Sequence, residues 1–174
     1  MDTTENTLEQ QHEKWLESFD FSFYSDWVLD DLKEQASLIG IDIDRIYYSG
    51  FSSQGDGAMF TGSYGYKKRW KALVIKEFPA NKELLEIGQQ LQDIQKKSLY
   101  KLTAVSTHRG RHYNDNSAII DVHYDDGIYS TDLEEDEIAS ALRSFMQYIY
   151  SSLEKEYEYQ TSLETFKQQQ EDIS

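Results

Sequence analysis

Residues 41–62 read IDIDRIYYSGFSSQGDGAMFTG, and this stretch decides the fold. Three isoleucines and two tyrosines fill residues 41–48 in a pattern typical of a β-strand. Residues 49–57 are rich in Gly and Ser, as loops are, and residues 58–62 are apolar enough for a return strand. The stretch therefore predicts a β-hairpin with a long connecting loop.

A second hairpin is predicted farther along the chain. Residues 99–107 and 117–124 alternate in the manner of strands, and the polar stretch 108–116 joins them. Residues 66–78 favour a short helix. A longer helix is predicted from just after Pro79-Ala80-Asn81 to about Lys97, because its apolar residues recur every three or four positions, at Leu84, Ile87, Leu91 and Ile94.

The amino-terminal end is predicted to be helical. Thr7 and Gln10 fit a capping box, which starts a helix over residues 8–18. A second helix is predicted over residues 24–39, with Gly40 as its stop. Its apolar stripe contains Trp27, Val28, Leu32, Ala36 and Ile39.

The carboxyl-terminal end is predicted to form a long helix, and the sequence leaves open whether it is continuous past Leu153. Thr131 and Glu134 fit a second capping box, and no Gly or Pro follows them. The helix would span about 40 residues, or about 60 Å. Its first half carries an apolar stripe that suits either the core or an oligomer interface: Ile138, Leu142, Phe145 and Ile149.

These elements predict an α+β protein. Two hairpins form an antiparallel sheet of about four strands, which packs with helices and carries a long carboxyl-terminal helix. The length of 174 residues indicates a single domain. Within it we expect an acidic helical arm (1–20), an α+β core (21–130) and a long acidic helix (131–174).

Charge is the main clue to function. The chain has 32 Asp and Glu against 17 Lys and Arg, a net charge of −15. Residues 1–44 carry −10, residues 45–125 carry +4 and residues 126–174 carry −9. Sequence-independent nucleic-acid binding needs a basic footprint, so we expect no direct nucleic-acid partner. We expect instead a partner protein with a basic surface.

Nucleic-acid mimicry is one form that such binding takes. From residue 131 onward, 8 net negative charges over about 60 Å give one charge per about 7.5 Å, whereas duplex DNA carries one per about 1.7 Å. Adding the charge of residues 1–44 brings the spacing to about 3.3 Å, close to one DNA strand. Mimicry therefore requires that the two ends lie together or that the protein forms a homodimer, which the sequence leaves open. The alternative is that the carboxylates only keep a monomer soluble.

The candidate contact residues are carboxylates of the two acidic ends and one tyrosine among them, because aromatic side chains next to charge are typical of protein interfaces. They are Asp30, Asp31, Glu134, Glu135, Asp136, Glu137, Glu154, Glu156, Glu158 and Tyr157.

Residues 48–62, YSGFSSQGDGAMFTG, are followed after the next helix by HRGRHY at 108–113. This pattern resembles small uncharacterised acidic proteins encoded by bacteriophages and prophages, over about residues 46–125. The resemblance implies a phage origin and no assigned active site. Since many small acidic phage proteins disable host defence or nucleic-acid enzymes, it also implies an anti-defence inhibitor in the host cytoplasm.

A different class of function uses the glycine-rich loop and the basic middle of the chain. Glycines let backbone amides face an anion, and basic side chains follow nearby. The spacing required for a nucleotide-binding glycine loop is missing. A nucleotide or another phosphorylated small molecule remains the alternative ligand, with Gln54, Gly55, Asp56, Lys68, Arg69, Arg109 and Arg111 as candidate binding residues.

Catalysis and cofactors are not expected. The chain has no cysteine, and its Ser, His and Asp residues lack a recognisable triad motif. His108, His112 and His123 could be read as metal ligands, but the first two lie in a loop with two arginines, which repel a cation. We expect no enzymatic activity, no metal, no cofactor and no membrane span, and we place the protein in the cytoplasm.

Overall fold

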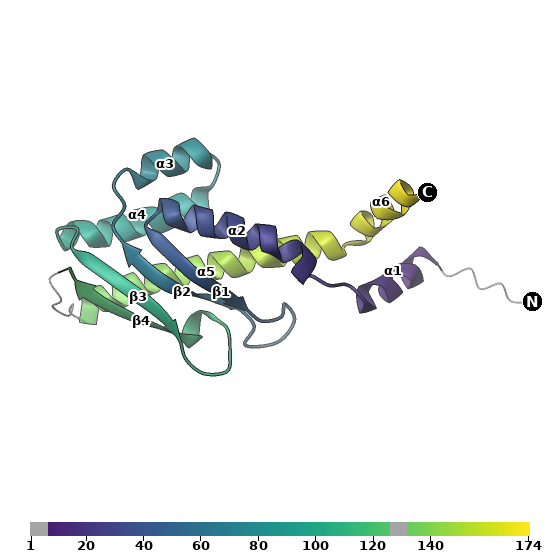
Figure 1. The fold of residues 1–174 in the computed structure, drawn as a ribbon, viewed down its shortest axis with the longest axis horizontal. Coiled ribbons are helices and arrows are strands. Elements are labelled where there is room, and N and C mark those ends of the chain that lie inside the picture. The colour runs from purple at the N-terminus through teal and green to yellow at the C-terminus, as the bar shows by residue number, and fades with distance from the viewer. Residues whose placement is uncertain (1–6, 126–131) are drawn as a thin grey trace, which may run out of the picture. The chain divides into compact units, whose positions relative to one another are not determined.

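The computed structural model describes residues 7–125 and 132–174. The chain forms two compact units: a terminal unit of residues up to Val28 together with Ser152–Ser174, and a sheet unit, Leu29–Ser151. In chain order the described elements are α1 (Leu8–Glu17), α2 (Ser22–Leu38), β1 (Ile41–Tyr48), β2 (Ala58–Gly65), α3 (Trp70–Glu77), α4 (Lys82–Lys97), β3 (Leu102–His108), the 3₁₀ turn η1 (Asp115–Ser117), β4 (Ala118–Tyr124), α5 (Asp132–Thr161) and α6 (Leu163–Ile173) (Figure 1).

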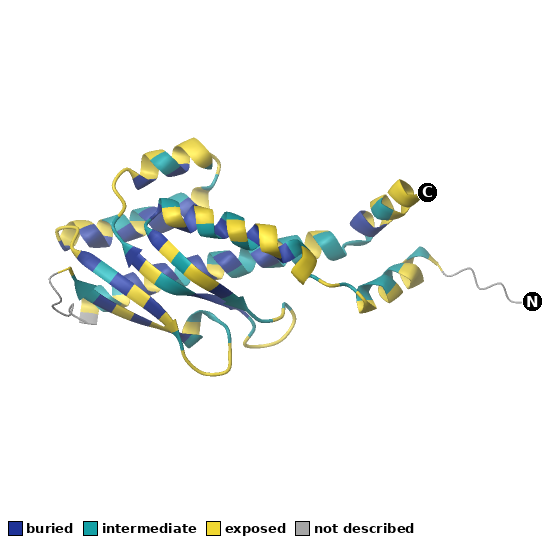
Figure 2. Ribbon diagram, viewed as in Figure 1, coloured by how far each residue is buried: buried dark blue, intermediate teal, exposed yellow. Residues whose placement is uncertain are grey.

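The α+β class and both hairpins are confirmed. The sheet has the order β1-β2-β3-β4, and every neighbouring pair is antiparallel. Along β3 and β4 buried and less buried residues alternate, so one face of the sheet is covered and the other is open (Figure 2). This alternation is the period of two that strands impose on side chains.

Helices α4 and α5 cover one face of the sheet (Figure 1). Phe60 of β2 meets Phe145 of α5 edge to face, with ring centroids 6.1 Å apart. All four residues of the apolar stripe on α5 are at most 1 % exposed, so the stripe is core and not an oligomer interface: Ile138, Leu142, Phe145 and Ile149.

Strand β3 begins at Leu102, three residues later than predicted. Leu99 and Tyr100 take positive φ angles of 56° and 60°, which are incompatible with a strand. The buried side-chain amide of Gln95 holds this turn by bonding both the N–H (3.1 Å) and the C=O (2.7 Å) of Leu102. The alternation of apolar and polar residues gives no sign of these two hydrogen bonds, so it predicts the start of the strand too early.

The predicted long carboxyl-terminal helix is confirmed as α5, and the structure shows that it ends at Thr161, with α6 following as a separate helix. Ser162 leaves the helical conformation at φ −67°, ψ 149°, and its hydroxyl caps α6 by accepting from the Thr165 amide (3.2 Å). The Thr165 hydroxyl in turn donates to the Tyr159 carbonyl (2.7 Å). Ser and Thr compete with helical hydrogen bonds in this way, so Gly or Pro is not needed for the break.

Of the two predicted capping boxes, the first is confirmed by both of its hydrogen bonds. The Thr7 hydroxyl accepts from the Gln10 amide (3.3 Å), and the Gln10 side chain accepts from the Thr7 amide (3.0 Å), as predicted. The second box depends on Thr131, which lies outside the described residues.

Gly88 in α4 is where the ring of Trp70 from α3 packs. A Cβ atom added to Gly88 would lie closer than 3.0 Å to three atoms of that ring. The ring is fixed, since it is 3 % exposed and its Nε1–H donates to Gln92 (2.5 Å). Helix α3 therefore docks on α4 through a glycine that helix propensity alone would disfavour.

Gly88→Ala should lower the free energy of unfolding by about 1–3 kcal/mol through overpacking against Trp70. In an exposed helix the same change would raise stability by about 1 kcal/mol, so the sign is diagnostic. Urea unfolding measures it, with exposed Gln90→Ala on the same helix as the control, which should stay within about 0.5 kcal/mol of wild type. A stabilised Gly88→Ala protein would contradict this docking.

Candidate functional site

The terminal unit brings the two ends of the chain together. The His12 ring Nε2–H donates to the Thr161 carbonyl (2.7 Å), which ties α1 to the end of α5. The Trp15 ring lies 5.3 Å from the ring of Phe166 in α6 and 5.1 Å from that of Phe19. Phe166 is only 3 % exposed. We call His12, Trp15, Phe19 and Phe166 the terminal ring cluster.

Acidic residues dominate this unit. Residues 1–28 and 152–174 contain 13 Asp and Glu against 3 Lys, a net charge of −10 out of the total −15. On α1, the exposed residues Glu9, Glu13 and Glu17 are four positions apart and so follow one helical face.

The predicted contact residues at the end of α5 belong to this unit. Glu158 is exposed, and Glu154 and Glu156 are half-buried, with Glu156 accepting from the Gln160 amide (2.8 Å). Tyr157 packs edge to face against Phe21, with centroids 5.4 Å apart, so it helps to hold the unit together.

The remaining predicted contact residues lie in the sheet unit. Asp30 and Asp136 are exposed, and Glu135 is half-buried. Three others bond within the fold: Asp31 accepts from Gln35 (2.7 Å), Glu134 accepts from the Tyr124 hydroxyl (2.6 Å), and Glu137 lies 3.7 Å from Lys97. The predicted contact residues are therefore divided between the two units.

Two aromatic residues on α2 are more exposed than the sequence indicates. Trp27 belongs to the apolar stripe predicted for this helix, but its side chain is 57 % exposed. Phe23 is 80 % exposed. The core of α2 is instead formed by Val28, Leu32 and Ala36. Phe23 and Trp27 are four residues apart, a spacing that could have revealed a second apolar face.

The glycine-rich loop 49–57 is closed by its own aspartate. The Asp56 carboxylate accepts from the backbone amides of Ser52 (3.1 Å) and Ser53 (2.8 Å). The bond from the Ser53 amide, the largest cause, holds the pKa of Asp56 below its usual value of 3.8. The amides that could have faced a bound anion thus bond a carboxylate of the chain.

The sheet separates the basic residues that the ligand alternative combines. Gln54, Gly55 and Asp56 precede the start of β2, whereas Lys68 and Arg69 follow its other end, which is about 25 Å away along an eight-residue strand. Arg109 and Arg111 lie in the other loop, 109–117. That loop meets the glycine-rich loop where the Asn114 side chain donates to the Gly55 carbonyl (3.1 Å).

The histidines read as metal ligands do not form one group, because the His108 ring Nε2–H donates to the His112 carbonyl (2.9 Å) while His123 lies apart from both. His108 pairs with Ala118 at one end of β4, and His123 pairs with Thr103 at the other. Over the described ranges, no group of three or more His, Cys, Asp or Glu is arranged to hold a metal ion. None of the described helices is long and apolar enough to span a membrane.

Fold and surface together define an α+β protein with a helix-covered antiparallel sheet and an acidic terminal unit. The chain belongs to the family described as a domain of unknown function, DUF8835, which matches residues 24–163. The matched range includes the whole sheet and both loops but leaves out α1. No curated protein and no solved structure matches the chain.

Asp56→Asn should make stability less dependent on pH. Because the folded-state pKa of Asp56 is lowered, the unfolded chain binds its proton more readily. The carboxylate therefore adds stability above pH 3.8, and this contribution is lost as pH falls through the folded-state pKa. Urea unfolding should show a deficit for the variant at pH 6 that shrinks below pH 3.8.

The matched control for this measurement is Asp121→Asn, which removes an exposed carboxylate from the open sheet face. It should stay within about 0.5 kcal/mol of wild type at pH 6. A deficit of Asp56→Asn that is equal at both pH values would show that the carboxylate does not hold the loop as described.

Proposed function

We propose that this protein is a non-enzymatic inhibitor that binds a basic surface of a host protein handling nucleic acid or acting in defence. The observation that carries the proposal is the terminal unit, in which the two acidic ends of the chain pack against each other. The resemblance of residues 46–125 to phage proteins adds support for a host target. The terminal unit would be the contact surface and the sheet unit the scaffold.

Charge density favours the packed ends over either end alone. Helices α1 and α6 each carry a net charge of −2 over about 15 Å, or one charge per about 7.5 Å. They contact each other and lie side by side (Figure 1). Together they carry −4 over the same length, about one charge per 4 Å, which approaches the 3.4 Å of a single DNA strand.

The charge pattern also indicates how binding would proceed. Carboxylates on an exposed helical face attract a basic partner over a distance and raise the rate of association, and salt weakens this attraction. A basic channel that normally takes nucleic acid offers the largest complementary surface, so occupancy by the terminal unit would displace that ligand. The expected inhibition is competitive and sensitive to salt.

The test uses the full-length protein as bait in host lysate at low and high salt, followed by binding measurements on the purified captured protein. Glu9→Gln, Glu13→Gln and Glu17→Gln together should weaken binding at low salt by about tenfold or more, which corresponds to about 1.4 kcal/mol. The wild-type protein should also displace a labelled DNA or RNA duplex from the partner.

The matched control removes the same three charges from α4 through Glu83→Gln, Glu86→Gln and Asp93→Asn, all at exposed positions. This control should bind as wild type does. Equal weakening by the two triple variants, or binding indifferent to salt, would rule out the terminal unit as an electrostatic contact surface.

A further inference from the structure

Three rings meet at the end of the sheet where the two loops lie. Tyr47 of β1 stacks on His108 of β3 (centroids 5.7 Å apart, 21° between planes) and on Tyr113 of loop 109–117 (5.1 Å, 20°). His108 and Tyr113 are 4.9 Å apart. All three residues are half-buried. We call them the loop ring cluster.

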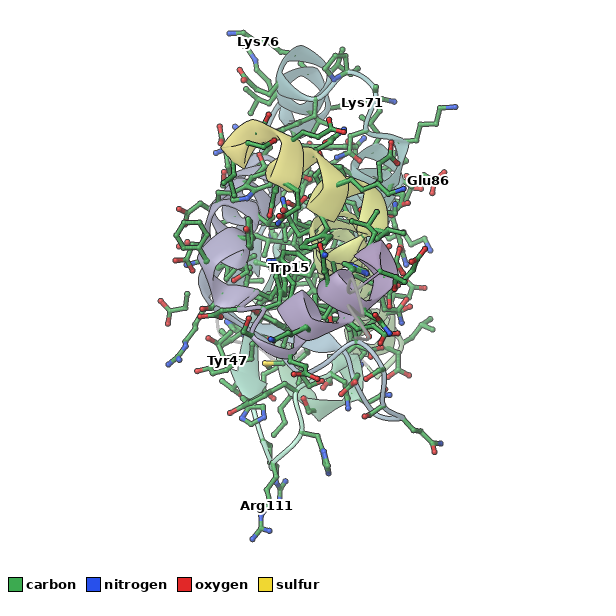
Figure 3. All side chains as sticks on the ribbon, turned by 90° about the vertical axis from the view of Figure 1, so that its right-hand side faces the viewer. Trp15, Tyr47, Lys71, Lys76, Glu86 and Arg111 are labelled. Carbon is green, nitrogen blue, oxygen red and sulfur yellow. The ribbon has the colours of Figure 1, made fainter. Side chains whose placement is uncertain are left out.

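Arginines surround these rings. The guanidinium of Arg45 lies over the ring of Tyr47, 4.8 Å from its centroid. Arg109 and Arg111 are both exposed, and Gly110 between them has φ +94° with open space around it. Figure 3 shows Arg111 extending outward from the end of the molecule at which Tyr47 lies (Figure 3).

The base of loop 109–117 is firmly anchored. The Arg143 guanidinium of α5 donates to the carbonyls of Asp115 (3.1 Å) and Ala118 (3.2 Å). The Asn114 side chain accepts from the amide of Ser117 (3.1 Å), and a Cβ on Gly57 would collide with Asn114. The Arg109 amide also donates to the Ser117 carbonyl (3.2 Å), so the exposed arginines extend from an anchored base, which limits the entropy lost when they bind a ligand.

Arg109 and Arg111 lie in a stretch of sequence without carboxylates, but aspartates of neighbouring segments lie close to the tip and keep their negative charge. Asp56 bonds the amides of its own loop, and the Asp115 side chain accepts from the Gln147 amide (2.9 Å). No Asp or Glu occurs between residues 57 and 76 or between residues 94 and 114. Asp44, which precedes Arg45, is exposed. The three aspartates offset the three arginines in net charge, so anion binding at this tip depends on the outward position of Arg109 and Arg111 and not on a net positive charge.

We propose that the loop ring cluster together with Arg109 and Arg111 binds a phosphorylated ligand that carries an aromatic base, namely a nucleotide, free or within a single strand. Guanidinium groups bond phosphate oxygens in pairs, and tyrosine and histidine rings stack on bases. The site replaces the ligand set predicted from the sequence, because Lys68 and Arg69 lie at the other end of β2 and Asp56 bonds the amides of the glycine-rich loop. It is separate from the acidic contact surface of the proposed function.

The test measures fluorescence anisotropy of a fluorescein-labelled dT12 strand titrated with the full-length protein, and competition by ATP and by inorganic pyrophosphate. Arg109→Glu with Arg111→Glu should weaken dT12 binding at least tenfold. Removal of two phosphate contacts should also lower the slope of log K against log salt by about 1.4. Tyr113→Leu should weaken binding about fivefold or more through lost stacking.

The matched control is Lys71→Glu with Lys76→Glu, which makes the same charge change at two exposed positions on α3 and should leave binding within about twofold of wild type (Figure 3). Thermal unfolding of each variant verifies the fold. If ATP and dT12 bind with similar affinity once the number of phosphates is taken into account, the ligand is a free nucleotide. If dT12 binds clearly more tightly than ATP on this basis, the ligand is a single strand.

Three results would overturn the proposal. The first is no binding of dT12 or ATP up to about 1 mM at low salt. The second is equal weakening by the arginine pair and the lysine pair, which would indicate only general electrostatic attraction. The third is displacement of dT12 by pyrophosphate as effectively as by ATP together with no effect of Tyr113→Leu, because the rings would then contribute nothing.

Discussion

The packing of Trp15 against Phe166 is the interaction on which the terminal unit depends, because it holds together two chain ends that repel each other. Truncating a buried ring such as Phe166 to alanine typically costs about 3–5 kcal/mol. Two like charges 10 Å apart in water repel by only about 0.4 kcal/mol. The buried ring of Phe166, the half-buried rings around it and the bond from His12 to the Thr161 carbonyl therefore offset the repulsion of many exposed carboxylates. This balance allows a highly charged surface to be built from segments far apart in sequence.

In the sheet unit, hydrogen bonds and close packing support two loops at one end of the four-stranded sheet. Asp56 organises one loop by accepting from its backbone amides, and Arg143 fixes the other by donating to its carbonyls. Contacts between the loops use Gly57, where no side chain would fit beside Asn114. The glycine-rich loop 49–57, the most distinctive part of the sequence, thus has a structural role. Its glycines and Asp56 shape a loop that supports loop 109–117, which carries Tyr113.

Much of the fold could be predicted because it is encoded locally. Alternation or apolar content identified all four strands, and caps or glycines located the ends of α1 and α2 within about two residues. The differences between prediction and structure have local chemical causes that simple periodicity overlooks: the Ser and Thr hydroxyls at Ser162 and the Gln95 clamp before Leu102. The exposure of Trp27 could not be predicted, because apolar spacing shows which residues share a helical face but not how far along the helix that face is covered.

The candidate sites were less predictable, since they depend on strand order and on contacts between distant segments. Sequence proximity joined Lys68 to the glycine-rich loop, but an eight-residue strand separates them. Tyr47 and Tyr113 meet only because β1 and β3 flank the same strand, and neither residue is among the candidate site residues predicted from the sequence. The mimicry hypothesis requires that the two acidic ends lie together, and ring contacts that no sequence motif predicts bring α1 and α6 together within the terminal unit.

The most direct test of this account is a nuclear Overhauser measurement between the Trp15 indole and the Phe166 ring in the isotope-labelled protein. The rings lie 5.3 Å apart, so cross-peaks are predicted at low salt, alongside those between Phe60 and Phe145 in the core of the sheet unit. Presence of the Phe60 to Phe145 peaks without those between Trp15 and Phe166 would contradict the account. The two acidic ends would then be separate, and neither alone carries the charge density that the proposed contact surface requires.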